Sequence, residues 1–347
     1  RPMAMNRRMH NKAWIADGRV AVVGGRNVGD EYFDAAAQTN FMDLDAVLIG
    51  PAVAQTSAIF DDFWNSASVI PLSALTTAEP DALEKLRENG DAGYRSAQAA
   101  DYVARLRGTP GVRALVGGNA LHWLDEVGVY SDPASKGQGE GQGQWLVHRL
   151  GRAMGEAKRE LRVISPYFVP GTEGTRWLVG KRAEGVDVSV LTNSLAANDV
   201  MAVHGGYAPY RMPLLEGGVD LFELMPHGKQ DSSLFGSSGA SLHTKAFAVD
   251  GEGGFIGSFN LDPRSVNLNT EMGVLFRDRS AAAALLRSYE AKIAADRSYR
   301  VRLQDGALRW EDASTQPPRV WDREPEASVW RRWTARAVGW LPVESQL

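Results

Sequence analysis

Residues 242–260, with the sequence LHTKAFAVDGEGGFIGSFN, decide the fold because they join charged side chains to an apolar strand and a glycine-rich turn. His243 and Lys245 stand two residues apart, so on a β-strand both side chains point to the same face. Residues 246–249 are small or apolar and predict a strand, which the glycine-rich residues 251–254 turn back into a second strand. The stretch therefore predicts a β-hairpin that directs an imidazole and an ammonium group into one pocket.

The same pattern occurs near the start of the chain. Residues 9–27, MHNKAWIADGRVAVVGGRN, repeat the order His-x-Lys-x4-Asp-x6-Gly-x-x-Asn. We name residues 10–27 the first motif and residues 243–260 the second motif. A single His beside a Lys is usually a feature of an exposed edge strand, but two copies at identical offsets indicate a shared function. The recurring pairs are His10 and His243, Lys12 and Lys245, Asp17 and Asp250, Gly24 and Gly257, and Asn27 and Asn260.

The paired side chains suit the chemistry of a phosphodiester. Such a group is anionic and resists attack, so its cleavage needs a nucleophile, a proton donor for the departing oxygen and cations that offset the developing charge. Two histidines and two lysines supply all of these without a metal. The duplicated motif resembles the HKD signature of the phospholipase D superfamily. The resemblance implies an α/β fold of two phospholipase D-like α/β/α repeats, related by a pseudo-two-fold axis, that share one active site at their interface.

Composition limits the alternatives. The 347 residues are 44% hydrophobic, enough for a large core or two domains. The absence of cysteine excludes disulfides and thiolate metal sites, and the six histidines lack familiar ligand spacing, so we predict neither a metal nor a cofactor. A net charge of −4 argues against nucleic acid as a partner. No apolar run approaches the roughly 20 residues of a membrane-spanning helix, so we expect a soluble or peripheral protein.

The order of the expected elements indicates two α/β repeats of unequal length. The first repeat would occupy residues 1–130 with a helical insert, and residues 131–144, rich in glycine and glutamine, would form a flexible linker. The second repeat would follow over residues 145–300, where strands and helices alternate, and residues 301–347 would form a tail. About 80 residues of such elements precede the histidine of the second motif but only nine residues precede that of the first. We therefore expect the first repeat to lack its opening strands.

Further stretches narrow the resemblance. SPYFVPG at residues 165–171, NDVMAVHGGY at 198–207 and GSFNLDPRSVNLNTEMG at 257–273 are similar to bacterial cardiolipin synthases. The turn GGRN, the strand DLDAVLIGPAV and the terminal LPVESQL are similar to the subtype of that family without long N-terminal membrane helices. The resemblance implies an enzyme that joins a phosphatidyl group to the glycerol hydroxyl of phosphatidylglycerol and so forms cardiolipin. Its donor would be phosphatidylglycerol or phosphatidylethanolamine.

Other functions stay open at this point. A hydrolytic phospholipase D, or another HKD phosphodiesterase such as a nuclease, uses the same catalytic residues with a different substrate or acceptor. The acidic balance and the absence of a basic aromatic stripe argue against the nuclease. A non-enzymatic alternative is an inactive, truncated remnant that binds lipid. For the synthase, the resemblance implies a cytoplasmic protein that is peripheral to the inner membrane.

The resemblance assigns the catalytic roles residue by residue. His10 would attack phosphorus and form a phosphohistidine, and His243 would act first as acid and then as base. A histidine in either role works best when a carboxylate orients its other ring nitrogen. Asp43, 33 residues after His10, and Glu271, 28 residues after His243, match the family positions of this partner.

A second group of residues would hold the substrate phosphate or shape the turns. The phosphate contacts implied by the resemblance are Lys12, Lys245, Asn27, Ser258 and Asn260. Gly25 departs from the second motif, which has Ser258 at this place, so one hydroxyl contact is expected to be lost. Asp17 and Asp250 complete the two motifs at hairpin turns, and we expect structural roles for them.

Three regions outside the motifs carry further expectations. Residues 51–66 predict a helix whose Phe60 and Trp64 face the core. His204 and Tyr207 either line a headgroup pocket or belong to the core. Residues 329–341 predict a helix that suits either the boundary of an anionic bilayer or docking onto the core. On one side of it lie Trp330, Trp333, Ala337, Trp340 and Leu341, and on the other lie Arg331, Arg332 and Arg336.

Overall fold

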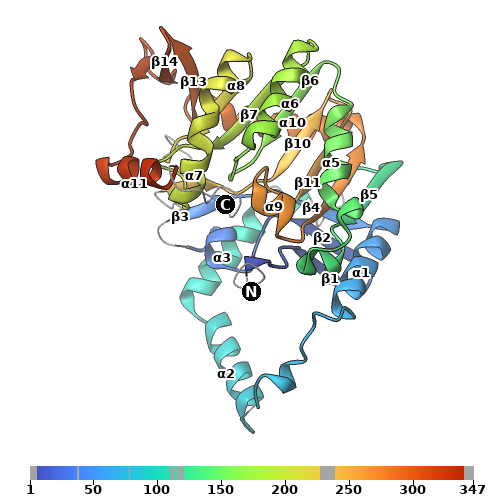
Figure 1. Ribbon diagram of the computed structural model, residues 1–347. Helices are drawn as coiled ribbons and strands as arrows, with labels where there is room; N and C mark the ends of the chain where they lie inside the picture. The colour runs from blue at the N-terminus through green and yellow to red at the C-terminus, as the bar shows by residue number, and fades with distance from the viewer. Residues whose placement is uncertain are drawn as a thin grey trace. The chain divides into compact units, whose positions relative to one another are not determined.

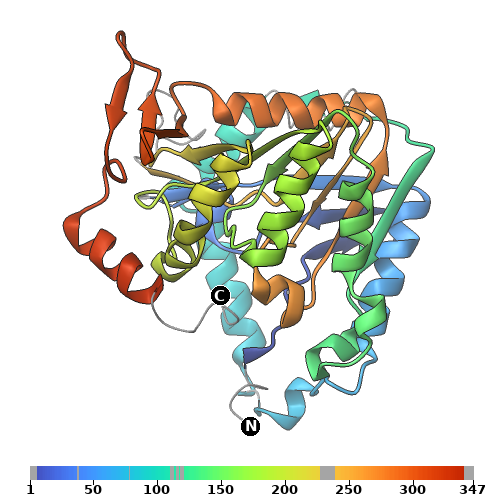
Figure 2. The same ribbon diagram turned by 45° about the horizontal axis from the view of Figure 1, so that its top comes forward.

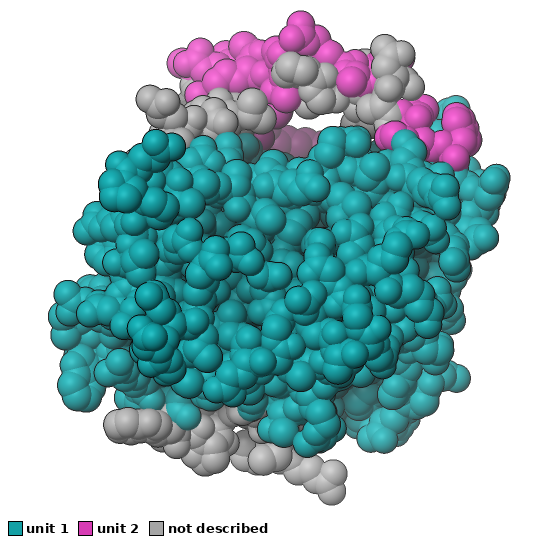
Figure 3. All heavy atoms as spheres, turned by 90° about the horizontal axis from the view of Figure 1, so that it is seen from above, with its two compact units in different colours: residues 1–62, 124–347 teal, residues 63–123 magenta. Residues whose placement is uncertain are grey.

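The computed structural model describes residues 6–36, 39–77, 79–109, 113–114, 117, 121–226 and 239–339. The chain forms two compact units, which Figure 3 shows in different colours. One unit contains residues 1–62 and 124–347, and the other contains residues 63–123. Because both motifs belong to the larger unit, the candidate site is formed within that unit alone.

A ten-stranded mixed sheet forms the centre of the larger unit. Its strands β6 (Glu160–Ile164), β7 (Asp187–Asn193) and β8 (Asp220–Leu224) are parallel, and every other neighbouring pair is antiparallel. The alternating strands and helices expected for the second repeat are therefore confirmed. The strand order is β15 (Arg319–Trp321), β14 (Ala307–Asp312), β13 (Ser298–Gln304), β8 (Asp220–Leu224), β7 (Asp187–Asn193), β6 (Glu160–Ile164), β10 (Ala246–Val249), β11 (Gly253–Gly257), β12 (Met272–Arg277) and β5 (Glu126–Ser131).

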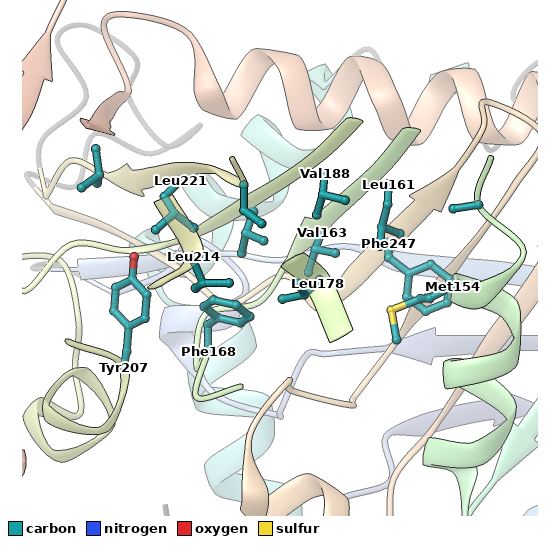
Figure 4. Close-up of a cluster of buried hydrophobic side chains, with 14 of the residues drawn as sticks. Met154, Leu161, Val163, Phe168, Leu178, Val188, Tyr207, Leu214, Leu221 and Phe247 are labelled. Atoms are coloured by element: carbon teal, nitrogen blue, oxygen red, sulfur yellow. The ribbon is translucent and has the colours of Figure 1, made fainter. Parts of the chain in front are cut away.

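Helices cover both faces of this sheet (Figures 1 and 2). One face is covered by α5 (Leu146–Gly155), α6 (Gly171–Ala183) and α8 (Arg211–Glu216), and the other by α10 (Arg279–Ile293). Figure 4 shows the main buried cluster, in which Val163 of β6 packs with Met154 of α5 and Leu178 of α6. The next residue of β6, Ile164, points to the opposite face and packs with Tyr289 of α10. The sheet is thus the middle layer of an α/β/α arrangement.

The first motif lies in a separate small sheet. Its antiparallel strands are β1 (Ala13–Ala16), β2 (Val20–Gly24) and β4 (Asp45–Ile49). The hairpin of β1 and β2 turns at an Asp-Gly pair with positive φ, and the hairpin of β10 and β11 turns at the same pair. Both predicted hairpins are therefore confirmed, and they share one turn geometry.

The small sheet packs against the ten-stranded sheet through an apolar contact. Val23 of β2 and Leu48 of β4 are buried together with Met272 and Val274 of β12. Burial of this apolar surface holds the two sheets together. It also fixes the first motif next to the strand that begins directly after Glu271.

The helix that follows the small sheet differs from the prediction at its far end. Helix α1 (Pro51–Trp64) buries Val53 as expected, but Phe60 is 50% exposed and Trp64 is 65% exposed. The buried residues of this helix all lie in its first two turns. Apolar periodicity continues beyond the part of the helix that is covered, so the prediction that these two aromatic side chains face the core is wrong.

Residues 131–144 form a folded segment in place of the flexible loop that their composition predicts. Two short helices, η4 (Ala134–Gln138) and η5 (Gln142–Gln144), follow β5. Gly139 and Gly141, which flank the turn between them, both have positive φ, a conformation that glycine adopts without steric cost. Lys136 is fully buried within this segment. The glycines therefore serve tight turns.

A further pair of helices in the larger unit packs together. Helix α11 (Val329–Gly339) packs on α7 (Met201–Tyr207), which continues into η6 (Ala208–Tyr210). The smaller unit contains η3 (Leu72–Ala74), α2 (Ala82–Tyr94) and α3 (Ala97–Gly108). Among the helices of the described ranges, none has the length and apolar character that crossing a bilayer requires.

Candidate active site

The strand that precedes the second motif pairs with the strand that precedes Asp43. Strand β9 (Gly239–Leu242) runs parallel to β3 (Thr39–Met42). Directly after this pairing, the N–H of His243 donates to the carbonyl of Met42 at 2.8 Å. Asp43 is the next residue after Met42. The parallel pairing therefore places His243 beside Asp43, although 200 residues separate them in the sequence.

The residue that precedes the first motif makes an equivalent contact with the residue that precedes Glu271. Met9 forms a parallel bridge with Thr270, and the N–H of His10 donates to the carbonyl of Thr270 at 2.9 Å. The N–H of Thr270 in turn donates to the carbonyl of Arg8 at 3.0 Å. Since Thr270 precedes Glu271, this crossing places His10 beside Glu271. The two crossings are equivalent, because in each a motif histidine donates its N–H to the carbonyl of the residue that precedes a carboxylate.

Each motif histidine is hydrogen-bonded to a carboxylate of the opposite repeat. Nδ1 of His10 lies 2.8 Å from Oε2 of Glu271, and Nδ1 of His243 lies 2.6 Å from Oδ2 of Asp43. Offsets counted within each repeat locate both carboxylates in the sequence, but the structure pairs each with the histidine of the other repeat. Each half of the site is therefore incomplete without the other half.

The two motif lysines occupy equivalent positions in this arrangement. Nζ of Lys12 donates to the carbonyl of His10 at 3.1 Å, and Nζ of Lys245 donates to the carbonyl of His243 at 2.6 Å. Burial lowers the pKa of each lysine to about 8, although the carboxylates of the crossed pairs attract both charges and oppose the shift. The lysines are thus held as poorly solvated cations, the form that binds a phosphate anion most strongly.

The two histidines differ in their exposure to water. The side chain of His10 is 26% exposed and that of His243 is 5% exposed. Burial, followed by repulsion from Lys245 and Lys12, lowers the pKa of His243 well below its usual range. The lowered pKa favours a neutral ring for His243, and the contact with Asp43 favours a proton on Nδ1.

A set of hydroxyl groups fixes the carboxylate of Glu271. Ser258 Oγ donates to Oε2 at 2.5 Å, and Oγ of Ser265, in α9 (Pro263–Asn267), donates to Oε1 at 2.9 Å. Ser258 is fully buried, and its hydroxyl also bonds the backbone of Met272. The phosphate contact expected for Ser258 is therefore not open to it, because the hydroxyl is committed to orienting Glu271.

The glycine that replaces this serine in the first motif has a steric cause. A Cβ atom at Gly25 would lie 2.5 Å from Oδ1 of Asp43, closer than side-chain carbons approach other atoms. Gly25 thus allows the carboxylate of Asp43 to lie directly against the backbone. In the second motif the longer side chain of Glu271 accepts a hydrogen bond from the hydroxyl of Ser258 instead. The prediction that Gly25 costs the first motif a phosphate contact is therefore wrong, because the hydroxyl it lacks serves a carboxylate.

The two motif asparagines are placed differently. Nδ2 of Asn27 donates to the hydroxyl of Tyr32, in η2 (Asp30–Tyr32), at 2.7 Å. The ring of Tyr32 stands edge-on to His243 with 5.0 Å between ring centroids. Asn260 is buried, and its Oδ1 makes no hydrogen bond with the described residues. Asn260 therefore retains side-chain bonding capacity, whereas Asn27 supports an aromatic wall of the site.

The motif aspartates have positions that suit the structural roles expected for them. The carboxylate of Asp250 accepts the backbone N–H groups of Lys158, Arg159 and Glu160 at distances between 2.7 and 2.9 Å. Partial burial alone would raise its pKa, but these N–H groups lower it below the usual value. Asp17 occupies the same positive-φ turn position in the first hairpin. Both residues therefore shape the hairpins that carry the lysines.

The motif pattern does not predict the aromatic residues that surround His243. Phe41 lies 5.2 Å and Tyr167 lies 6.5 Å from the imidazole, measured between ring centroids. The hydroxyl of Tyr167 donates to Oδ2 of the exposed Asp199 at 2.8 Å. Tyr167 and Asp199 belong to the stretches SPYFVPG and NDVMAVHGGY, so the signal for them was the resemblance of these flanking stretches.

His204 and Tyr207 do not line a headgroup pocket. Both are buried, and Nε2 of His204 contacts the guanidinium group of Arg211. Arg211 is also buried and pairs with Glu223 at 2.9 Å. Burial and the neighbouring Arg211 lower the pKa of His204 well below its usual range. Of the two alternatives, these residues belong to the core.

Comparisons with known proteins place this geometry in a family. Residues 150–293 match the family model described as "Cardiolipin synthase, PLD-like domain". Cardiolipin synthase C of Escherichia coli (strain K12) is 38% identical over 348 residues, which cover 98% of this chain and 73% of that protein. A cardiolipin synthase of a Geobacillus species (strain WCH70) is 27% identical, and the match covers 82% of this chain but 46% of that protein.

A solved structure shows a similar fold over nearly the whole chain. It is the phosphatidylserine synthase of Haemophilus influenzae Rd KW20, with a TM-score of 0.56 and 15% sequence identity. The match covers 98% of this chain and 71% of that one. This structural similarity confirms the expected α/β fold. The identity shared with the Escherichia coli protein over nearly the whole chain shows that the chain belongs to the cardiolipin synthase family of phospholipase D-like proteins.

Proposed function

We propose that the chain is a phosphatidyl transferase that forms cardiolipin from phosphatidylglycerol and a second phospholipid. The observation that carries this proposal is the pair of crossed histidine–carboxylate contacts, each with a motif lysine bonded to the same histidine's carbonyl. Such a site supplies a nucleophile, an acid and two cations around one phosphorus atom. The family of the chain supplies the lipid nature of the substrate.

The reaction is proposed to run in two displacements. In the first, Nε2 of His10 forms a bond to phosphorus, the bond from phosphorus to the leaving alcohol breaks, and Nε2 of His243 gives a proton to that alcohol. In the second, His243 takes the proton of the glycerol hydroxyl of phosphatidylglycerol. The freed oxygen bonds to phosphorus, and the phosphorus–nitrogen bond breaks. Lys12 and Lys245 offset the charge on the phosphoryl oxygens in both steps.

Two observations bear differently on which histidine is the nucleophile. The low pKa of His243 favours a neutral ring there, which suits a nucleophile, whereas the family resemblance favours His10. Repulsion from two lysines contributes to the low pKa, and a phosphodiester between those lysines would offset that part of it. We therefore retain His10 as the proposed nucleophile and expect His243 to gain its proton together with the substrate.

The products of a lipid assay distinguish the candidate functions. Purified protein is incubated with vesicles of phosphatidylglycerol, with and without phosphatidylethanolamine, and the lipids are identified by mass spectrometry. We expect cardiolipin, with glycerol released if phosphatidylglycerol is the donor and ethanolamine released if phosphatidylethanolamine is. Phosphatidic acid as the sole product would instead identify a hydrolytic phospholipase D. Vesicle binding without any product would identify a lipid-binding remnant.

The lysine pKa values predict how the reaction depends on pH. Because both motif lysines have a pKa of about 8, they are charged below this pH and lose their charge as the pH rises through it. We expect kcat/KM, which reports the free enzyme, to fall above about pH 8 with a limiting slope that approaches two protons. The fall in kcat should begin at higher pH, because bound phosphate stabilises the charged lysines. A kcat/KM that stays level to pH 10 would contradict this role.

A surface on α11 fits the expected contact with the membrane, and we propose that it binds the bilayer boundary. Trp330 is 74% exposed and Trp333 is 62% exposed, so these side chains do not dock onto the core. The helix is held instead through Ala335, whose carbonyl would lie 2.5 Å from a Cβ atom at Gly205 of α7. Tryptophan side chains favour the boundary between lipid headgroups and acyl chains. Trp340 and Leu341, expected on the same side, lie outside the described residues.

The arginines of α11 have a different role from the one expected. The guanidinium group of Arg331 donates to the carbonyl of Asn198, and that of Arg332 donates to the carbonyl of Ala327 at 2.6 Å. These two arginines therefore fasten the helix to the protein, while Arg336 is exposed. The membrane contact is best tested through the exposed tryptophans.

Replacing Trp330 and Trp333 together with alanine is expected to weaken binding to phosphatidylglycerol vesicles by about tenfold, because two interfacial aromatic groups are lost. The measurement is co-sedimentation with vesicles over a range of lipid concentrations. Trp123→Ala is a matched control, since Trp123 is 79% exposed and lies outside both motifs. If the double variant sediments as well as the parent does, α11 is not the membrane contact.

A further inference from the structure

Asp132 is hydrogen-bonded to both backbone groups of Glu271, the carbonyl and the N–H. Its N–H donates to the Glu271 carbonyl at 2.8 Å, and its Oδ2 accepts the Glu271 N–H at 2.9 Å. The other carboxylate oxygen, Oδ1, accepts the N–H of Leu146, the first residue of α5, at 2.7 Å. Asp132 follows β5 directly, so it connects the end of that strand, the start of α5 and the residue that orients His10.

Lys136 completes this support from within the folded segment 131–144. Its Nζ donates to Oδ2 of Asp132 at 2.8 Å and to the carbonyl of Ser265 at 2.8 Å. It also lies 4.9 Å from the ring centroid of Trp145. Both charged side chains are completely buried. Burying an ion pair costs desolvation energy that its attraction does not always return, so stability alone is a weak reason for such a pair.

The pair is linked to His10 by two short routes. Asp132 holds the backbone of Glu271, and Lys136 holds the backbone of Ser265, whose hydroxyl donates to Oε1 of Glu271. Glu271 also attracts the charge of Lys136 directly. The carboxylate of Asp43 is placed differently: it lies against the backbone of Gly25, and its Oδ1 accepts the N–H of Leu44 at 2.8 Å.

We propose that Asp132 and Lys136 are positioning residues, which hold Glu271 and through it His10 in the orientation for attack on phosphorus. The proposal rests on the function proposed above, because it assigns the pair to that reaction. A carboxylate that orients a reacting histidine must itself be fixed in place, and loss of such outer partners typically lowers activity by about 10- to 100-fold.

The test compares two variants of the pair with a matched lysine elsewhere. Lys136→Met keeps the length of the side chain and removes its charge, and Asp132→Asn keeps the shape of the carboxylate. Lys181→Met is the control, because Nζ of Lys181 also donates to a backbone carbonyl and a carboxylate, at Gly155 and Glu184, but far along the chain from Glu271. The measurements are kcat and KM for transfer, the melting temperature, and the NMR signal of the proton between His10 and Glu271.

We expect Lys136→Met and Asp132→Asn to lower kcat by about tenfold or more with KM nearly unchanged, and to shift or broaden the His10 proton signal. In a Glu271→Gln background, the further loss from Lys136→Met should largely disappear. Lys181→Met should leave kcat and the His10 signal unchanged even where it lowers the melting temperature. If Lys136→Met is too unstable to assay, Asp132→Asn carries the same expectations.

Wild-type kcat and an unaltered His10 signal in both pair variants would overturn the proposal, as would losses that multiply with that of Glu271→Gln. A wild-type protein without transfer activity would instead count against the proposed function. In that case the NMR signal still decides whether the pair orients His10, because it does not depend on turnover.

Discussion

Replacing either motif histidine with asparagine is expected to reduce phosphatidyl transfer by about 10⁴-fold or more, and replacing both should cost little more than replacing one. The reason is that both histidines take part in each displacement, His10 through its bond to phosphorus and His243 through proton transfer, so either loss stops the cycle. The measurement is kcat/KM for cardiolipin formation by the two single variants and the double variant. Losses that multiply in the double variant would show that the histidines act independently.

An activated substrate separates the two histidine roles. In a p-nitrophenyl phosphodiester the leaving group departs as a stable anion and needs no proton from His243. We expect His243→Asn to release about one equivalent of p-nitrophenol and then to stall, because the covalent intermediate lacks the base for the second step. His10→Asn should release none. The opposite result would make His243 the nucleophile, the assignment that its low pKa favours.

Replacing the carboxylates of the crossed pairs is the second large effect. Asp43→Asn and Glu271→Gln should each lower transfer by about 10³- to 10⁴-fold, because an amide no longer favours the ring tautomer that leaves Nε2 free to react. Asp278→Asn is a matched control, since Asp278 caps α10 through the N–H of Ala281 and an asparagine there retains the cap. This control should keep nearly full activity.

The activated substrate also tests the crossing itself. Asp43 contacts His243, so Asp43→Asn should still give the first burst of p-nitrophenol. Glu271 contacts His10, so Glu271→Gln should lose that burst. If each carboxylate served the histidine of its own repeat, the two variants would exchange these results. The experiment therefore distinguishes the crossed arrangement from pairing within a repeat.

Local chemistry in the sequence was sufficient to predict the hairpins and the residues that form the site. The Asp-Gly turns, the apolar strands beside them and the duplicated spacing are properties of short stretches, and the structure contains both hairpins at these places. The positions of Asp43 and Glu271 also followed from the resemblance. Their partners did not, because the pairing depends on strands β3 and β9 and on the bridge from Met9 to Thr270, which join distant parts of the chain.

The sequence could not indicate which polar groups are already committed to one another. Ser258 looks like a phosphate contact until its hydroxyl is found on Glu271. Residues 131–144 have the composition of a flexible loop, yet Lys136 is buried there in an ion pair. Phe60 and Trp64 follow a core-like period but remain exposed. In each case the burial or bonding of the side chain depends on which residues pack against it. Periodicity and composition carry no information about those neighbours.

We propose that one histidine of this shared site carries the phosphatidyl group between donor and acceptor. The most direct measurement is tandem mass spectrometry of protein that has been quenched during turnover of phosphatidylglycerol. We expect a phosphatidyl group bound to His10 and no such group in the His10→Asn variant. Cardiolipin formation without a covalent adduct on either His10 or His243 would contradict it.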